Sequence, residues 1–209
     1  MIIIPEGEIL TAGQFKDYVF ATEVLLPKTL VKIPRNCFEH CYSLKKVVIP
    51  GNVKIIEEGA FSMCGLEEVI LQEGVERIGK NAFWFCDKLK KIVIPKSVKH
   101  IDPSAFYCSG LEEVVFQEGI KQIWDGAFKD CKKLERVVMP KTLETIRKSA
   151  FQNSGLKKIE IPDSVKTIGD SAFFYCKYLE EVYLSEGLEK IGDGAFSMCD
   201  SIRYLNLPN

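Results

Sequence analysis

Residues 168–190 read IGDSAFFYCKYLEEVYLSEGLEK, and most of the chain repeats this stretch. The related segments follow one another at intervals of 22 or 23 residues and begin at Ile33, Ile56, Ile78, Ile101, Ile123, Ile146 and Ile191. Self-similarity at a fixed period of this size is typical of a solenoid, in which each unit buries its apolar side by stacking on its neighbours. The sequence therefore predicts one elongated repeat domain.

Each unit predicts a short strand, a short extended segment and a single helical turn. In the quoted copy Val182 and Leu184 are two residues apart, which is the period of a strand with one face buried. The strand ends at a Pro or at a Glu-Gly pair, where the chain leaves the ladder. A small polar residue then precedes Ala172 and Phe173, which favours one turn of helix.

The lengths of the units alternate between 23 and 22 residues, so that the larger repeat is a pair of 45 residues. The shorter units carry Gly65, Gly110 or Gly155 just before the first Leu of the strand, and Gly permits the tight corner that a shortened unit needs. Residues 1–32 are a degenerate copy of the repeat, which we interpret as an N-terminal capping unit. Residues 33–209 form the array, whose last unit is partial.

One Phe recurs in every unit and predicts an aromatic spine in the core. Its members are Phe38, Phe61, Phe83, Phe106, Phe128, Phe151, Phe173 and Phe196. Replacing one of them by Ala in the middle of the stack should cost about 3 to 5 kcal/mol.

Six of the eight cysteines lie three residues after this Phe, where two other units have Ser109 and Ser154. A slot that accepts Ser or Cys requires a small side chain. Cys37 replaces the repeat Ala, and Cys108 lies one residue out of register. We therefore predict buried, reduced, structural thiols rather than disulfides or metal ligands.

The pattern LxxVxIPxxVxxIGxxAFxxC closely resembles the BspA-like class of bacterial leucine-rich repeats over about residues 20–209. This resemblance implies a right-handed horseshoe with a parallel sheet on its concave side. Together with the turn motif, it predicts an α/β repeat solenoid with short strands and helical turns on the convex side. It also implies a bacterial cell-surface or secreted protein with a role in adhesion or protein binding and without enzymatic activity, although the N-terminal sequence MIIIPEGE does not read as a signal peptide.

Composition and motifs argue against several function classes. A net charge of −1 gives no bulk attraction for nucleic acid or anionic membranes, and the apolar runs are too short to span a bilayer. The chain lacks the common nucleotide, zinc-protease, hydrolase and calcium-loop motifs, and His40 and His100 have no catalytic partner at a recognisable spacing. We expect no enzyme activity, no cofactor and no metal.

Two columns of residues are expected to point outward from the concave sheet. The first alternates in charge almost throughout and predicts ion pairs between neighbouring strands, with a role in solubility and register; it comprises Glu23, Lys46, Glu68, Lys91, Glu113, Arg136, Lys158 and Glu181. The second is aliphatic over six units and is our candidate binding surface; it comprises Leu25, Val48, Ile70, Val93, Val115 and Val138. Tyr183 and Tyr204 follow on the same face as candidate anchors.

The aliphatic column has two interpretations. Val and Ile suit any pleated surface, so the column could reflect β preference in a passive spacer within a larger surface protein. A continuous exposed apolar stripe also marks interaction sites, and we predict that it binds a protein or another macromolecule. A weaker candidate is the convex aromatic set, which comprises Trp84, Tyr107, Trp124, Phe174 and Tyr175.

The end of the chain, LNLPN, follows directly on the strand of the last unit. Ile191, Phe196, Leu205 and Leu207 then have no following unit to cover them. An uncovered apolar edge favours pairing with another chain. We therefore expect an end-to-end homodimer through the C-terminal edge, or a longer array of which this chain is a piece.

Overall fold

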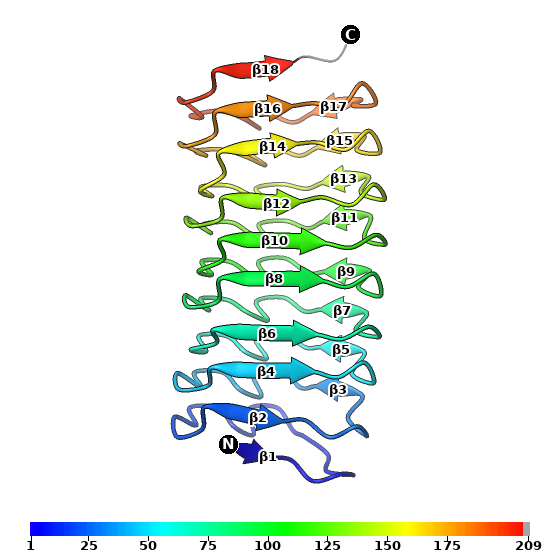
Figure 1. Cartoon of the computed structure of the whole chain (residues 1–209), viewed down its shortest axis with the longest axis vertical. Coiled ribbons are helices and arrows are strands. Elements are labelled where there is room, and N and C mark those ends of the chain that lie inside the picture. The colour runs from blue at the N-terminus through cyan, green and yellow to red at the C-terminus, as the bar shows by residue number, and fades with distance from the viewer. Residues whose placement is uncertain (207–209) are drawn as a thin grey trace.

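A computed structural model describes residues 1–206 of the chain as a solenoid of stacked coils (Figure 1). In each coil from β2 (Glu23–Leu25) to β17 (Lys190–Ile191) a front strand crosses, the chain turns, and a two-residue strand returns behind it in the opposite direction (Figure 1). The coils climb from the N-terminus at the bottom with a right-handed winding, the hand that parallel crossovers prefer (Figure 1). The predicted leucine-rich-repeat solenoid is therefore confirmed.

The longer strands lie side by side and parallel on what we call the front face. They are β1 (Ile2–Ile3), β2 (Glu23–Leu25), β4 (Lys46–Ile49), β6 (Glu68–Leu71), β8 (Lys91–Ile94), β10 (Glu113–Phe116), β12 (Arg136–Val138), β14 (Lys158–Glu160), β16 (Glu181–Tyr183) and β18 (Tyr204–Asn206). Hydrogen bonds join them in three groups, β1-β2-β4-β6, β8-β10-β12 and β14-β16-β18.

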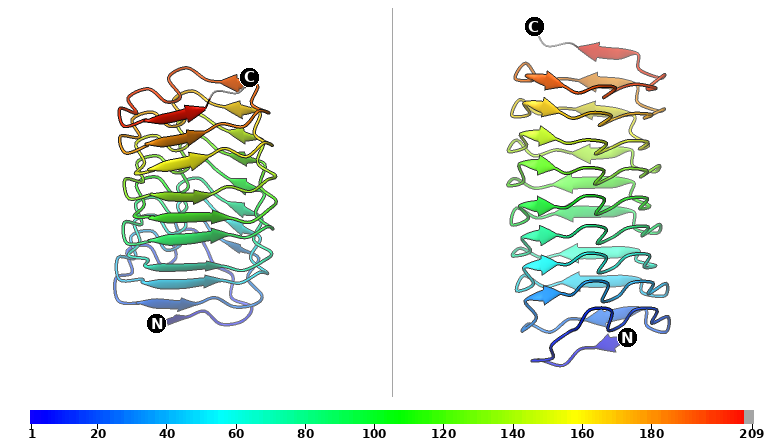
Figure 2. Two further views of the ribbon diagram at one scale, coloured as in Figure 1. Left: turned by 45° about the horizontal axis from the view of Figure 1, so that its top comes forward. Right: turned by 180° about the vertical axis from the view of Figure 1, so that it is seen from behind.

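The shorter strands form the back face, seen from behind in Figure 2. They are β3 (Lys32–Ile33), β5 (Ile55–Ile56), β7 (Arg77–Ile78), β9 (His100–Ile101), β11 (Gln122–Ile123), β13 (Thr145–Ile146), β15 (Thr167–Ile168) and β17 (Lys190–Ile191). They pair in parallel in the groups β3-β5-β7-β9 and β11-β13-β15-β17. The segments expected to be extended are thus short strands.

The prediction of helical turns on the convex side is wrong, because residues 1–206 contain no helix. The backbone takes a left-handed conformation two residues before and two residues after each spine Phe, as at Asn36 (φ 54°) and His40 (φ 61°) around Phe38. A left-handed residue interrupts a right-handed helix. The small polar or Gly residue before Ala-Phe therefore serves a left-handed turn, not a helix cap.

Hydrogen bonds between coils replace those of the expected helix. The Phe61 amide donates to the Ala82 carbonyl of the next coil (2.8 Å), whereas the Ala60 amide donates to Glu57 in its own coil (3.2 Å). Alternate amides thus point along the stack, and the turn segments form a third ladder beside the two sheets. Strands and turns all advance by one strand spacing per coil, so neighbouring coils are equally far apart at the front and at the back. The coils form a straight column in Figures 1 and 2, so the horseshoe that the resemblance implies is wrong.

The aromatic spine is confirmed in the core. Neighbouring Phe rings from Phe15 to Phe196 stack with centroids 5.0 to 5.4 Å apart and nearly parallel planes. Phe15 lies in the segment predicted to be the cap, so this segment continues the same stack; its role as a cap stays a prediction.

The cysteines are free, and seven of the eight are buried, as predicted; Cys108 is half-buried. The recurring slot has a further explanation that the sequence did not provide. The Cys64 thiol donates to the Phe38 carbonyl (2.9 Å), and the Cys86 thiol donates to the Phe61 carbonyl (3.2 Å). In the cysteine units the slot thus holds a small side chain that donates to a carbonyl, whereas the Ser109 hydroxyl lies 3.3 Å from the Cys131 thiol.

A two-coil unit is visible at the turn after the front strand. The Glu118 carboxylate accepts hydrogen bonds from the amides of Lys141 and Thr142 in the next coil (both 3.1 Å), and the Gly119 amide donates to the Thr142 hydroxyl (2.8 Å). The same reciprocal contacts join Glu73-Gly74 to Lys96-Ser97 and Glu6-Gly7 to Lys28-Thr29. We call this arrangement the Glu-Gly clamp.

The opposite corner alternates with coil length. Gly110 is buried, and a Cβ atom at this position would collide with the Asp87 carbonyl oxygen of the preceding coil. Gly65 and Gly155 approach Tyr42 and Lys132 in the same way. The expected tight corner in the shorter coils is confirmed.

Candidate interaction surface

The aliphatic stripe, defined as Leu25, Val48, Ile70, Val93, Val115 and Val138, points outward from the front sheet as predicted. Leu25 is 59% exposed, Ile70 39% and Val93 40%, whereas Val48 and Val115 are half-buried. Strand alternation places them there, because their neighbours on either side are core residues. Parallel register aligns Val115 with Val93 on one side and with Val138 on the other.

Ile3 extends the stripe by one coil, which the sequence reading missed. It lies on β1, is paired with Leu25 and is 61% exposed. The sequence signal was the apolar run of the first four residues, in which a strand places Ile4 in the core and Ile3 on the outer face. The stripe therefore begins at the first strand and ends at β12, after which Glu160 occupies its column.

The charged column beside the stripe pairs across strands, as predicted. The Lys46 amine lies 2.7 Å from the Glu68 carboxylate, and Glu113 bridges Lys91 (2.5 Å) and Arg136 (3.2 Å). The hydrogen bond from Lys91 and the charges of Lys91 and Arg136 lower the pKa of Glu113. Exposed pairs of this kind contribute about 0 to 1 kcal/mol each, so the column sets register and solubility more than stability.

Tyr183 and Tyr204 meet at the C-terminal end of the front face, and we call them the tyrosine pair. Their ring centroids are 4.9 Å apart, and the Lys158 amine lies 4.6 Å from the centroid of Tyr183. The Tyr183 hydroxyl donates to Glu181 (3.0 Å), and this hydrogen bond raises the pKa of Tyr183. The pair is thus held in one geometry, with Tyr204 47% exposed.

The back aromatic residues do not form one cluster. Phe174 contacts Tyr175, and Trp124 lies under the Arg147 guanidinium at 4.4 Å, but within residues 1–206 no ring contact joins Trp124 to Trp84 or Tyr107. All five are half-buried.

Among residues 1–206 the titratable groups do not form a catalytic constellation. The Nδ1 and Nε2 atoms of His40 lie 2.8 Å from an Asp17 carboxylate oxygen and 3.1 Å from the Met63 sulfur, respectively. Asp17 and Met63 are each 23 residues from His40, so the repeat period would have predicted both contacts. Burial raises the pKa of Cys86 and Cys131 to about 12, which keeps both thiols protonated at neutral pH.

Over the described part of the chain, no three His, Cys, Asp or Glu side chains are grouped so as to hold a metal ion. Residues 1–206 include no helix that could cross a membrane.

The C-terminal edge leaves apolar side chains partly exposed. Ile191 and Leu205 are each 42% exposed and Phe196 is half-buried, whereas Ile168 and Phe173 in the preceding coil are fully buried. Leu207, which we also expected at this edge, lies outside the described residues. Self-association through this edge stays a prediction.

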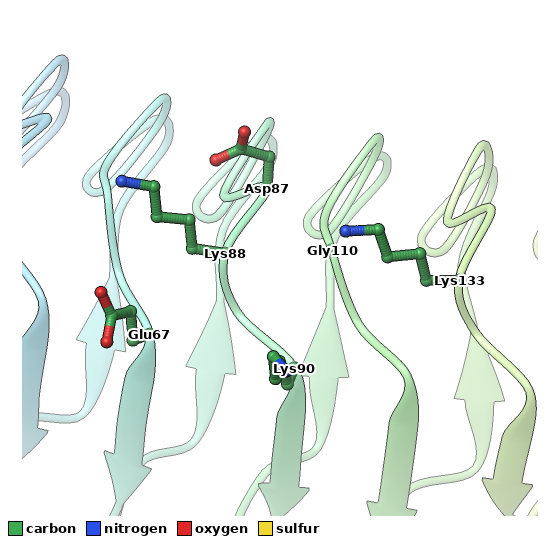
Figure 3. Close-up of a pocket in the computed structure, with 6 residues that line it drawn as sticks. All are labelled: Glu67, Asp87, Lys88, Lys90, Gly110 and Lys133. Carbon is green, nitrogen blue, oxygen red and sulfur yellow. The ribbon is translucent and has the colours of Figure 1, made fainter.

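A recess at the corner before the front strands was not anticipated. It measures 360 Å³ and is lined by Glu67, Asp87, Lys88, Lys90, Gly110 and Lys133 (Figure 3). It lies where a shorter coil is set back between two longer ones. The alternation of 22 and 23 residues was its signal in the sequence.

Comparisons with known proteins place the chain among bacterial repeat proteins. A family model described as a BspA type leucine-rich repeat region matches residues 8–135 and 100–209, with six copies. No curated protein sequence matches significantly.

Solved structures show the same fold. A leucine-rich repeat protein from Bacteroides ovatus is 25% identical with a TM-score of 0.64, and the match covers 99% of this chain and 74% of that one. A leucine-rich repeat protein from T. pallidum is 33% identical with a TM-score of 0.55, covering 56% of this chain and 58% of that one. A leucine-rich cell surface protein from Faecalibacterium prausnitzii is 22% identical with a TM-score of 0.55, covering 100% and 75% respectively.

Proposed function

Because the chain belongs to the BspA-type leucine-rich repeat family, we propose that it is a non-enzymatic module that binds another protein on its front face. The observation that carries this proposal is the aliphatic stripe, which faces outward along the front sheet with four of its six side chains exposed. A solenoid places these side chains in a line because each coil contributes one of them at the same height. A cell-surface or secreted location is part of this proposal and rests on the resemblance to surface proteins of the family.

The magnitudes indicate what kind of partner fits. The six side chains span about 25 Å at the spacing of parallel strands. Since roughly half of each surface is already buried in the sheet, covering the rest contributes about 1 kcal/mol per residue. The total of about 6 kcal/mol barely offsets the cost of association, which is about 4 kcal/mol or more. A partner must therefore gain further contacts.

Those further contacts are available along the same face. The charge column runs beside the stripe, and the tyrosine pair continues the face beyond β12. Aromatic side chains that are held in place before binding lose little entropy on association. We therefore propose an elongated protein segment that lies along the column, with apolar groups on the stripe and an anchor at Tyr204.

A displayed random-peptide library tests this proposal directly. Peptides are selected on the whole chain and then measured against a variant with Ile70→Lys and Val93→Lys. The matched control is Val31→Lys with Ile55→Lys, since Ile55 is 38% exposed and other coils carry Lys or Arg in both of these back-face columns.

We expect selected peptides to lose binding to the front variant and to keep binding to the control. Both variants should keep the melting temperature of the parent, because none of the four positions faces the core. If no peptide is enriched, or if the enriched peptides bind both variants equally, the front face is a plain sheet surface and the spacer interpretation replaces ours.

A further inference from the structure

At the corner before the front strands, the longer coils protrude and the shorter coils are set back. The longer coils place Asp87-Lys88, Lys132-Lys133 and Lys177-Tyr178 at this corner, and all six residues are exposed. The shorter coils between them place Gly110 and Gly155 there, and both are buried. Protruding corners therefore alternate with recesses, and successive protrusions are two coils, or about 10 Å, apart.

The charge on these protrusions is not neutralised within the protein. Lys88, Lys132 and Lys133 form no ion pair among residues 1–206, and Lys177 rests on the ring of Tyr175 at 4.3 Å. We call these four residues the lysine corner. In Figure 3 the side chain of Lys88 reaches toward the coil of Glu67, and that of Lys133 reaches toward the coil of Gly110.

The nearby carboxylates are largely occupied by other lysines. Glu67 pairs with Lys45 (3.4 Å), and Glu112 pairs with Lys90 (3.6 Å). In the next coil Glu135 pairs with Lys157 (3.0 Å). Asp87 is the one carboxylate on these protrusions, so the lysine corner carries a positive excess over a length of several coils.

We propose that the lysine corner binds a linear anionic polysaccharide that runs along the column and crosses the recess over Gly110. The spacing of the lysines matches a polymer of low charge density, because neighbouring protrusions are two coils apart. A polysaccharide with one acidic sugar in every two has its carboxylates at a comparable separation. Tyr178, which is 62% exposed beside Lys177, offers a ring face to a sugar.

Nucleic acid fits this edge less well. Its phosphates are far more closely spaced than the protrusions, and the carboxylates of Asp87, Glu112 and Glu135 lie next to the path. Dense negative charge would meet those carboxylates between every pair of lysines. This is why the proposal commits to a glycan.

The test uses fluorescein-labelled hyaluronan fragments, which carry one carboxylate for every two sugars, and measures their anisotropy with the whole chain at low and at high salt. The test variant is Lys132→Gln with Lys133→Gln. The matched control is Lys80→Gln with Lys148→Gln, because these exposed back-face lysines also lack ion-pair partners in the described structure. Neutral dextran and oligo(dT) are measured in parallel.

We expect hyaluronan to bind at low salt, to weaken severalfold in the corner variant and to weaken with salt less steeply there. The control and the front-face variant Ile70→Lys with Val93→Lys should bind like the parent, so this result is independent of the proposed protein partner. Absence of hyaluronan binding, an equal loss in the control, or equal binding of dextran would overturn the proposal. Tighter binding of oligo(dT) would overturn it in favour of nucleic acid.

Discussion

Replacing Phe106 by Ala should be among the most destabilising single substitutions in the described fold. Phe106 is fully buried, and its ring stacks on Phe83 and on Phe128 with 5.2 Å between centroids in both cases. A buried Phe→Ala change costs about 3 to 5 kcal/mol, and each stacked contact adds about 0.5 to 1.5 kcal/mol. We expect a loss of about 5 kcal/mol in the free energy of unfolding.

The same change at Phe196 provides an internal comparison. Phe196 is half-buried and stacks on one ring only, that of Phe173 at 5.0 Å. With one contact and part of the area, its replacement by Ala should cost about 2 kcal/mol. The difference between the two positions isolates the effect of being enclosed by coils on both sides.

Urea denaturation measures both losses, with fluorescence from Trp84 and Trp124, which lie in the coils on either side of Phe106. Hydrogen exchange should show the extra opening confined to those coils in the Phe106 variant, because each repeat contacts only its neighbours. If Phe106→Ala costs less than about 2 kcal/mol, or no more than Phe196→Ala, the spine is not the main stabilising element of the stack.

Three further predictions follow from the geometry. Replacing Asn81 (φ 55°) by Ala should cost about 1 kcal/mol in urea denaturation, while Gly should be tolerated there, because Gly fills the same left-handed position in other coils. Burial raises the pKa of Cys86 and Cys131 to about 12 from an ordinary value of 9.0, so these thiols ionise first in the unfolded chain and stability should fall between pH 9 and 12. The melting temperature of the Cys86→Ala, Cys131→Ala variant should vary less over that range. An equal dependence of melting temperature on pH in the variant and the parent would contradict this. The chain should associate with rising concentration in sedimentation, and Leu205→Lys should abolish this; a monomer at every concentration would refute it.

The front face could be predicted because its information is local. Val93 and Ile94 are adjacent in sequence, and the period of a strand alone sends one outward and the other inward. The stacking then follows from the repeat, so that the spine, the stripe and the charge column were all predictable from one 23-residue unit. What the stripe binds is not encoded in that period, and for this reason it is a proposal.

The turn after the back strand could not be predicted for a physical reason. This turn position holds Asn, Ser or Gly, as at Asn36, Ser104 and Gly59. These residue types favour both the N-cap of a helix and the left-handed conformation. The choice between the two is made by a hydrogen bond to the next coil, such as that from Phe61 to Ala82. A contact between residues so far apart in sequence is invisible to local propensity.

The recess at the lysine corner was missed for a related reason. The alternation of coil lengths and the position of Gly110 were clear, but a sequence does not show which lysines find a carboxylate. Lys90 and Lys133 occupy neighbouring parts of the corner, yet only Lys90 has an acidic partner. Side-chain reach, and not residue type, decides this difference.

The Glu-Gly clamp determines how an array of this kind can change its length. Deleting residues 96–140, a stretch of 45, would bring Lys141 and Thr142 opposite Glu73 and Gly74 and would rebuild every hydrogen bond of the clamp. Deleting a single coil, such as residues 96–117, would instead set Glu118 against Glu73.

Two carboxylates would then face each other, and the Gly74 amide would lose its hydroxyl acceptor, which is Ser97 in the intact chain. At this junction a gain or loss of two coils therefore preserves the clamp. An odd step at this junction leaves a like-charge pair at the join, so a gain or loss of an even number of coils is favoured there.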